Sequence, residues 1–536
     1  MLKMVDGTGI IGVDMVCPLG ATVSPPQPPN YDNIEMEGVG SLMLPNSLKA
    51  PIERLELIGN STQGENPAPD NPQEIKSAGR KSKNLFNIAD LRVGQVQKDG
   101  TINEKSTYYR TAILHVPEDG KYRITFNSND DYTMLYFTEA YANGAYSKPY
   151  IRVQAGNPNH YITLEKGKNI LSFSTHTASE KIVFTTDHNI MIAAESETLD
   201  YEPYGYLLDV KVTGENLLDM ADIQNENGKI DSDFSKAKSI KPFKVIKDRK
   251  YLLISKGAMI VDVRYSSIYF GEDDLAYEQD SSRKLTTGTG YSCFIGTETR
   301  KILVAKETCT ITKTMMHGTR TEKDAYEVEE LGLFEIINDN PNIDYEPYTE
   351  QTMQIVLDEP LRGVGEYKDV LTKDGVVRKI YPPYEINLND SRDGGYSRTN
   401  TVMFSVKVQN KTVGYASLKP SILCNILPDC GLQTGNIYND DKECIAVGGG
   451  IVLFRVNKSR LKDISSFEAI KQSFIELMEG KKMLVEYALE TSVTEPLPES
   501  VQQQLQALHS ENGTTHVFVD SGEVPCGIKL TYRKEK

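Results

Sequence analysis

Short runs in which apolar and polar residues alternate fill most of this sequence. Clear examples are KYRITFNS from residue 121, YTMLYFTE from residue 132 and NIMIAAE from residue 189. Each run has the two-residue period of a half-buried β-strand, and Asn, Asp and Gly turns separate one run from the next. Roughly eight such runs in about 120 residues favour a two-sheet β-sandwich of the jelly-roll type.

A long internal repeat organises the first two thirds of the chain. The sequence Asp-Tyr-Glu-Pro-Tyr stands at 200–204 and again at 344–348. Earlier landmarks recur in the same order at nearly constant spacing, and they indicate that a structural module is duplicated. The matched pairs are Asn84-Leu85-Phe86 with Asn216-Leu217-Leu218, residues 132–137 with 265–270, and residues 168–171 with 300–303.

We therefore predict two copies of one β-sandwich, module 1 at 84–205 and module 2 at 216–349. The extra residues of module 2 are expected at 311–326, between two strands. Pro203 and Pro347 are predicted to end a strand, because proline cannot donate a hydrogen bond to a β-ladder. The repeated motif would then mark the seam between modules, with its tyrosines across the open end of the sandwich. A ligand-binding role for these tyrosines is the alternative.

The remaining sequence is expected to form five further units. They are an N-terminal segment with a Pro-rich spacer (1–50), a β linker (51–83), a β-hairpin connector (350–383), a third β-sandwich-like domain with one helix (384–496), and a C-terminal helix with a β-hairpin (497–536). The predicted fold class is mostly β, with tandem jelly-roll β-sandwich modules and a C-terminal α+β domain.

The helix of the third domain is predicted from a change of period. Phe467, Ile470 and Phe474 recur at helical spacing and share one face. Ser465 and Glu468 have the spacing of a capping box, and Gly480 suits the position just after the last turn.

Composition narrows the classes of partner. The 536 residues carry a formal net charge of −16, contain no Trp, and hold seven cysteines without a CxxC pair. An acidic chain repels phosphate backbones and anionic lipid, so nucleic acid and membrane surfaces are poor partners. No apolar run is long enough for a transmembrane helix, and the first residues do not resemble a signal peptide. Free, buried thiols are expected, with neither a zinc ribbon nor a disulfide framework.

Motifs of catalysis are missing from the sequence. It has no HExxH, GxSxG, P-loop or GxGxxG in a strand-to-helix context, so an enzyme is not expected. Three histidines of module 1, His160, His176 and His188, lack ligand spacing, and His317 stands alone. Paired carboxylates for glycoside hydrolysis stay open, because sequence spacing does not reveal a separation across a cleft.

Two acidic turns raise the question of a metal. Asn129-Asp130-Asp131 and Glu272-Asp273-Asp274 lie near corresponding strands of the two modules. Clustered carboxylates can hold Ca²⁺, so a structural calcium is one interpretation. The interpretation we favour is a solvated turn without a cofactor.

A tyrosine-rich loop in module 1 is the candidate binding site. In EAYANGAYSKPY, Tyr141, Tyr146 and Tyr150 come close together, and Asn143 helps to make the turn. Flat aromatic faces stack against sugar rings while polar neighbours bind hydroxyl groups. The sequence therefore suggests carbohydrate binding here, with tyrosines that only cover a sheet edge as the alternative.

Several motifs together resemble a known family. The run from Leu55 through Gly59, Pro69-Asp70-Asn71-Pro72 and Ile75 is similar to a segment of tail-tip and minor structural proteins of phages and prophages of Gram-positive bacteria. The same family is matched, in order, by an Asn-Leu-Phe module start, a Tyr-Glu-Pro-Tyr closing motif, the run from Pro360 to Ile380, and the C-terminal stretch from FEAIKQSF through LVEYALETSVTEPLPESVQQQLQAL. The resemblance extends over most of the chain from residue 51.

The resemblance implies a component of a virion tail, made in the cytoplasm of the host bacterium. Residues 1–50 would attach it to the particle, other tail or baseplate proteins would be its partners, and it would form a homotrimer, the common symmetry of tail fibres. It would contribute to host attachment through a cell-surface glycan. The alternatives are a secreted or virion-borne glycan hydrolase with carbohydrate-binding modules, and a purely architectural baseplate or head-decoration protein.

Overall fold

The fold is that of a computed structural model. It describes residues 5–6, 9–10, 30–97, 101–104, 109–127, 134–142, 145–147, 151–154, 160–174, 188–197, 200–224, 226, 230–231, 237–257, 267–276, 280–287, 293–294, 298–317, 325–326, 328–337, 339, 341–395, 397–413, 420–430, 437 and 441–536. The prediction of a mostly β protein is confirmed. Within the described residues there are two α-helices, α1 (Phe467–Met478) and α2 (Glu499–Ala507).

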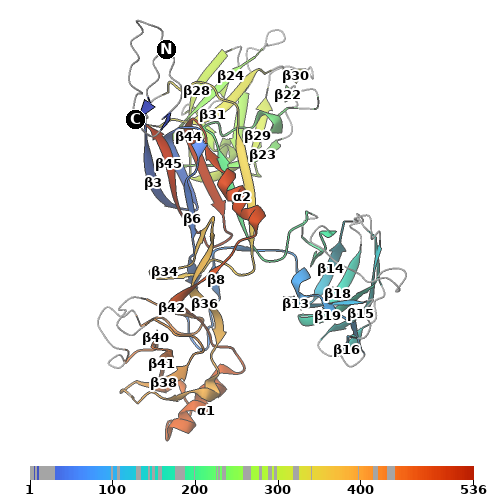
Figure 1. Cartoon of the computed structure of the whole chain (residues 1–536), viewed down its shortest axis with the longest axis vertical. Helices are drawn as coiled ribbons and strands as arrows, with labels where there is room; N and C mark the ends of the chain where they lie inside the picture. The colour runs from blue at the N-terminus through green and yellow to red at the C-terminus, as the bar shows by residue number, and fades with distance from the viewer. Residues whose placement is uncertain are drawn as a thin grey trace.

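A twelve-stranded antiparallel sheet, the central sheet, connects the other parts of the molecule (Figure 1). Its order is β32 (Glu350–Leu357), β21 (Tyr206–Thr213), β44 (Gly513–Asp520), β4 (Ser41–Ser47), β45 (Gly527–Glu535), β6 (Arg54–Ile58), β35 (Val370–Thr372), β36 (Gly375–Glu385), β42 (Leu484–Glu495) and β39 (Ile422–Cys424). β3 (Tyr31–Val39) pairs with β45, and β9 (Arg80–Lys81) pairs with β21.

The strands of the central sheet come from segments that lie far apart in the sequence. β3 pairs with β45 along its whole length, from Tyr31 opposite Glu535 to Val39 opposite Gly527. Residues 31–47 are therefore part of this sheet and do not belong to a separate N-terminal unit. The segments expected as linker, connector and C-terminal hairpin contribute strands to the same sheet.

Alternation along each strand places one face of the central sheet in a common core. In β44, Val517 and Val519 are buried while Phe518 between them is exposed. Successive strand residues point to opposite faces, so the apolar set gathers on one side. α2 packs onto this core through Leu505 and, partly, Val501.

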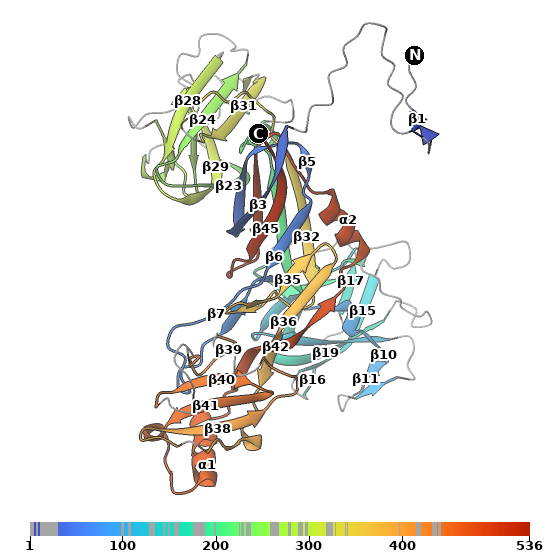
Figure 2. The same ribbon diagram turned by 60° about the vertical axis from the view of Figure 1, so that its left-hand side comes forward.

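Three domains are inserted into hairpins of the central sheet. Module 1 lies between β9 and β21, module 2 lies between β21 and β32, and the third domain lies between β36 and β42. In each case the strand before and the strand after the domain pair with each other. Module 2 and the third domain consequently lie at opposite ends of the central sheet, with module 1 at its side (Figures 1 and 2).

Module 1 contains two sheets that enclose one core. The first has the order β10 (Arg92–Val93), β13 (Arg110–Val116), β19 (Gly167–Ser174), β15 (Met134–Ala142) and β16 (Ala145–Ser147), with β17 (Ile151–Gln154) paired to β15. The second has the order β18 (Tyr161–Leu164), β14 (Gly120–Thr125) and β20 (Met191–Ala194). Leu114 and Phe173 of the first sheet share a core with Ile124 and Ile192 of the second.

Module 2 repeats this strand order. One sheet runs β23 (Lys238–Val245), β29 (Cys309–His317), β25 (Ser267–Gly271) and β27 (Cys293–Phe294). The other runs β26 (Leu285–Thr286), β28 (Glu298–Ala305), β24 (Lys250–Lys256) and β31 (Glu330–Glu335). β13-β19-β15 thus corresponds to β23-β29-β25, and β18-β14-β20 corresponds to β28-β24-β31.

Strand pairing corrects one landmark of the repeat. Residues 168–171 lie in β19, but residues 300–303 lie in β28, the counterpart of β18. Both segments are apolar strands of similar length, so the sequence match did not distinguish two neighbouring strands. The landmark was wrong, although the order of the strands agrees.

The extra residues of module 2 also lie elsewhere than predicted. Lys121 pairs with Thr163 in module 1, and the equivalent Lys250 pairs with Val304 in module 2. More residues separate Lys250 from Val304 than separate Lys121 from Thr163. From Thr163 to Ile192 and from Val304 to Leu333, by contrast, the number of residues is equal. The additional residues therefore precede β28 and do not lie at 311–326.

The third domain begins in the same way as the modules. Asn87 and Asn387 each cap a short 3-10 turn, and each donates to a carboxylate three residues later, Asp90 and Asp390 respectively. After the turn, β10 pairs with β13 in module 1, and β37 (Arg392–Asp393) pairs with β38 (Thr401–Lys407) in the third domain. The third domain thus shares its entry with the modules.

Beyond its entry the third domain has a different layout. Its sheet has the order β37, β38, β41 (Ile451–Asn457) and β40 (Cys444–Gly448). α1 packs against this sheet through Ile470 and Phe474. The helix begins one residue later than predicted, because Ser466, and not Ser465, accepts the hydrogen bond from Ala469 N.

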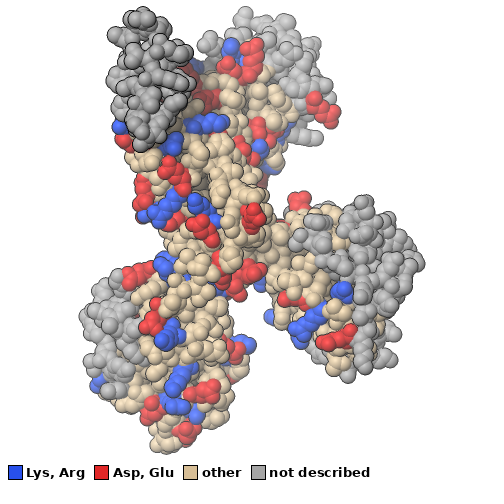
Figure 3. All heavy atoms as spheres, viewed as in Figure 1, with Lys and Arg blue, Asp and Glu red and all other residues tan. Residues whose placement is uncertain are grey.

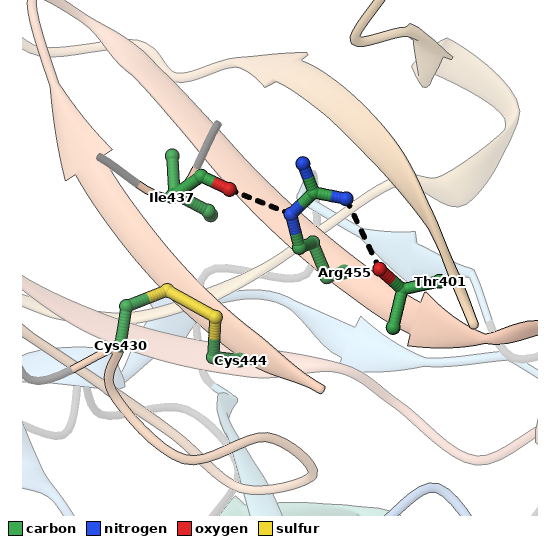
Figure 4. Close-up of a disulfide and its surroundings, with 5 residues drawn as sticks. All are labelled: Thr401, Cys430, Ile437, Cys444 and Arg455. Atoms are coloured by element: carbon green, nitrogen blue, oxygen red, sulfur yellow. Dashed lines mark hydrogen bonds between the residues drawn. A yellow bond between two sulfur atoms is a disulfide. The ribbon is translucent and has the colours of Figure 1, made fainter. Parts of the chain in front are cut away.

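The opposite face of this sheet carries a disulfide (Figure 4). Cys430 and Cys444 are bonded, with their Cα atoms 4.9 Å apart. The expectation that all cysteines are free thiols is wrong for this pair, while Cys424 and Cys526 are free and buried. Beside the disulfide, the fully buried Arg455 donates to the carbonyl of Ile437 at 2.6 Å and to Thr401 Oγ1 at 3.1 Å.

A buried charge network, here called the neck network, joins the central sheet to the third domain. Asp369 is 0% exposed and accepts from the backbone N of Arg362, Lys379 and Ile380 and from Arg378 Nη1. Arg362 pairs with Glu486 of β42, Nε to Oε1 at 3.2 Å. β36, β42 and the segment before β35 are thereby held together at one point.

Removing the centre of the neck network should destabilise the protein strongly. Asp369→Ala removes one of the two carboxylates that Arg378 contacts, leaving Glu495, and leaves three backbone N–H groups unsatisfied, at a cost of about 3–5 kcal/mol. The exposed turn variant Asp374→Ala should change the free energy of unfolding by less than about 0.5 kcal/mol. Urea unfolding of the full chain gives both values, and equal effects of the two variants would contradict the structural role of Asp369.

A hollow on the central sheet as the candidate functional site

The predicted tyrosine loop is described only in part. Tyr141 of β15 and Tyr146 of β16 are paired in register across an antiparallel hairpin. Asn143 and Tyr150 lie outside the described residues. The pairing brings two of the four candidate residues together at one end of module 1, and carbohydrate binding by this loop stays a prediction.

The repeated motif serves as the closure of each module. Asn84 donates from Nδ2 to the carbonyl of Glu202 at 3.1 Å, and Asn216 donates to the carbonyl of Glu346 at the same distance. Each asparagine also accepts through Oδ1 from two backbone amides, one of them in the last strand of its module, Ile192 N in β20 or Leu333 N in β31. The first residue of the module therefore holds its last strand and its exit segment. We call this arrangement the asparagine clamp.

The position of the two prolines differs from the prediction. Pro203 and Pro347 lie in extended segments outside any strand, immediately before β21 and β32 respectively. The predictions that they end a strand, and that the motif passes directly from one module to the next, were wrong. The motif connects each module back to the central sheet.

The motif tyrosines have different surroundings in the two modules. Tyr201 and Tyr204 are 39% and 40% exposed. Tyr345 packs edge-on against Phe334, and Tyr348 donates to Glu350 at the start of β32. The second pair thus helps to attach module 2, whereas the first pair is open to solvent.

An ionic cluster fixes module 2 beside the central sheet. Lys241 of module 2 contacts Asp219 at 2.8 Å and Glu350 of β32 at 3.5 Å, and Lys211 of β21 contacts Glu350 at 2.8 Å. Burial opposes ionisation of Glu350, but the hydrogen bonds from Lys211 and Tyr348 hold the pKa of its carboxyl below the ordinary value. Glu350 is therefore a carboxylate that ties both cations to the sheet.

Next to this cluster lies a hollow of about 630 Å³, here called the sheet hollow. Its floor is formed by β32, β21 and β44, mainly by the face that points away from the core, and the core residues Val210 and Met353 also line it. Pro242 of β23 and Gln504 of α2 also line it. Volumes of 300–1,000 Å³ are usual for binding sites of small molecules.

Strand register arranges the floor of the sheet hollow in two rows. Gln354, Asp209 and Asp520 form one row, and Thr352, Lys211 and Phe518 form the next. Asp209 is oriented by Gln354 Nε2 at 2.7 Å and by Arg80 at 3.2 Å. Asp520 accepts from Gly522 N at 2.9 Å through Oδ1. The carboxylates are thus held in place by neighbouring donors.

Phe518 is the apolar element of the sheet hollow. It is 45% exposed, although its neighbours Val517 and Val519 are almost completely buried. A flat ring open to solvent among fixed carboxylates, an amide and a cation can bind a ligand by stacking and hydrogen bonds together. Sequence reasoning missed this residue, because the alternation in HVFVD predicts only that Phe518 faces away from the core.

The described residues offer little for metal chemistry. No group of three or more His, Cys, Asp or Glu side chains among them could hold a metal ion. Of the acidic turns, Glu272 contacts Lys284 at 3.1 Å and Asp273 lies 3.8 Å from Lys313, while residues 129–131 lie outside the described part. Of the histidines considered above, His188 is buried and His317 belongs to β29. Burial lowers the pKa of His160. His176 lies outside the described residues.

Acidic and basic side chains alternate over the visible face of the described part of the molecule (Figure 3). The net charge of −16 is thus accompanied by many local ion pairs there. Neither helix of the described residues is long and apolar enough to cross a membrane.

Comparison with known proteins found no matching family model, no matching curated protein and no matching solved structure.

Substituting each clamp asparagine in turn tests whether it holds the last strand of its own module. Asn216→Ala removes three hydrogen bonds and should cost about 2–3 kcal/mol of local stability in module 2. Hydrogen exchange of the full chain should show faster exchange in β31 and unchanged exchange in β20. Asn84→Ala should give the opposite pattern, so each module is the control for the other. Unchanged protection in both variants would contradict the clamp.

Glu215 makes the attachment of module 2 sensitive to pH. It lies between Gly214 and the clamp residue Asn216. Its carboxylate approaches the backbone of Gly513 closely: a Cβ atom at that position would lie only 2.6 Å from Oε2 of Glu215. Burial, followed by repulsion from Glu346, raises the pKa of Glu215 to about 7. The neutral carboxyl is therefore favoured in the folded protein.

The sign of this shift predicts lower stability at higher pH. With the folded-state pKa raised, the contribution of Glu215 is fully present below pH 4.5 and is lost as the pH rises through about 7. Because the side chain is partly exposed, we expect a loss of up to about 1 kcal/mol. The midpoint temperature of thermal unfolding should therefore decrease more between pH 5 and 8 in the wild type than in Glu215→Gln. Parallel pH profiles would contradict the assignment.

Proposed function

We propose that this protein is a structural component of a phage virion tail, at the baseplate, the tail tip or a tail fibre, and that it contributes to host attachment. The resemblance of its ordered motifs to tail-tip and minor structural proteins supports this proposal. On this proposal its partners are other tail proteins and a glycan of the host surface, and three copies assemble around one axis.

The observation that carries the proposal is the insertion of three separate domains into hairpins of one sheet. Each domain enters and leaves through neighbouring strands, so modules 1 and 2 can vary without disturbing the central sheet, whereas the third domain also contributes β39 to it. Such a scaffold presents several surfaces at once, and repeated weak sites on an assembly give firm attachment through avidity. We propose that the two modules are jelly rolls of the carbohydrate-binding type.

Module 1 is our candidate for direct contact with a host glycan through Tyr141 and Tyr146, with Asn143 and Tyr150 beside them. The in-register pairing of the first two residues supports this choice, since directly opposite residues of an antiparallel pair are close neighbours. A catalytic role is not part of the proposal, because the sequence lacks the catalytic motifs considered above.

Labelling of intact particles tests the proposal directly. Antibodies against the purified chain should bind at the tail of phage particles released from the bacterium that carries the gene, as seen by gold labelling in the electron microscope. Antibodies against an unrelated cytoplasmic protein of the same bacterium are the control. Labelling of the head would favour a decoration protein, and unlabelled particles together with protein free in the culture medium would contradict a tail component.

A further inference from the structure

The sheet hollow has features that a solvated sheet face does not need. Phe518 exposes almost half of its surface at a position where Thr or Lys would serve a wet strand equally well. Asp209 and Asp520 lie directly opposite each other, an unfavourable pairing for two carboxylates. Both features become useful when a ligand binds there.

The centre of the floor, formed by β21, offers side chains and no free backbone. β21 is paired with β32 on one side and with β44 on the other from Asp209 to Thr213. An extended peptide gains affinity mainly by adding a strand to an unpaired sheet edge, so the centre of this floor does not suit one. The ligand must instead use ring stacking and hydrogen bonds to side chains.

The charges of the lining residues restrict the ligand further. Asp209 is already paired with Arg80 at 3.2 Å and Lys211 already contacts Glu350 at 2.8 Å, so Asp520 is the lining carboxylate left for a ligand. A polyanion such as a phosphate-rich polymer would meet net negative charge. Carboxylates accept hydrogen bonds from hydroxyl groups, and Gln354 and Thr352 can donate as well as accept. These preferences fit an uncharged, hydroxyl-rich ring.

We propose that the sheet hollow binds a neutral oligosaccharide, with one sugar ring stacked on Phe518 and its hydroxyl groups bonded to Asp520 and the Asp209–Gln354 pair. Pro242 of module 2 and Gln504 of α2 bound the site, so a chain of a few sugars lies between module 2 and the helix. The site belongs to the central sheet and is distinct from the tyrosine loop of module 1. It deepens the proposed host attachment, on which its biological meaning rests.

The absence of tryptophan from this sequence allows a direct optical test. Phe518→Trp retains an aromatic platform and introduces the only tryptophan of the chain. The purified full-length variant is titrated with an array of neutral oligosaccharides of two to six hexose or N-acetylhexosamine units. Stacking should change the intensity or wavelength of tryptophan emission in a saturable way. Val493→Trp, at another exposed apolar position of the same sheet, is the matched control and should not respond.

Binding by isothermal calorimetry then assigns the contribution of each group. Phe518→Ala should weaken binding roughly five- to tenfold, whereas Phe518→Tyr should retain it. Asp520→Asn should weaken binding while circular dichroism stays unchanged. Adding Tyr141→Ala and Tyr146→Ala to Phe518→Trp should leave the saturable change of tryptophan emission as it is, because the tyrosine loop is a separate site.

The outcomes separate this inference from the proposed function. Failure of every sugar to bind, or binding that Phe518→Ala leaves unchanged, would overturn the sheet hollow as a glycan site. Loss of binding only when Tyr141 and Tyr146 are replaced would assign the glycan to module 1 instead. None of these results alters antibody labelling of the tail, which tests the function itself.

Discussion

The buried neck network is the constraint on which the architecture depends. Asp369 and Glu486 are almost completely withdrawn from water, so each needs its arginine and its hydrogen-bond donors in one specific arrangement. Burial raises the pKa of Glu486, against the opposing effects of Arg362 and Ser61. A mispaired register would leave a buried charge alone, which costs far more than a lost apolar contact. The network thus selects the pairing of β36 and β42, and with it the position from which the third domain extends.

The same principle of closure recurs at smaller scale in the modules. Asn84 and Asn216 each satisfy backbone groups from three places, the module start, its last strand and its exit segment. A side chain that both donates and accepts can do this, and an aspartate or a leucine of similar size cannot. Because each module closes on itself, the central sheet receives two neighbouring chain ends and continues its pairing as though the insertion were a turn. That independence explains how one sheet accommodates three domains and how the outer face of β21 and β44 stays open beside module 2.

In the proposed function, the molecule acts through surfaces that the central sheet holds in place. The hairpin of Tyr141 and Tyr146 belongs to an inserted module, whereas the sheet hollow belongs to the scaffold and is completed by Pro242 of module 2. The ionic cluster of Lys211, Lys241 and Glu350 lies between the two parts, so it both attaches the module and sets one boundary of the hollow. In the proposed glycan site, attachment of module 2 and recognition of the sugar would meet at that boundary.

The sequence by itself determined the local structure and the duplication. Period-two alternation revealed the strands, helical spacing revealed α1 to within one residue of its cap, and the Asp-Tyr-Glu-Pro-Tyr motif revealed two modules of one strand order. These features depend on neighbouring residues, which is why they are readable along the chain.

Only the tertiary structure decided which strands share a sheet. β3 and β45 lie at opposite ends of the chain, and their pairing follows from long-range register and from burial of a common core. The sheet hollow has the same origin: Asp209, Gln354 and Phe518 meet because three distant strands lie side by side, and no local pattern encodes that contact.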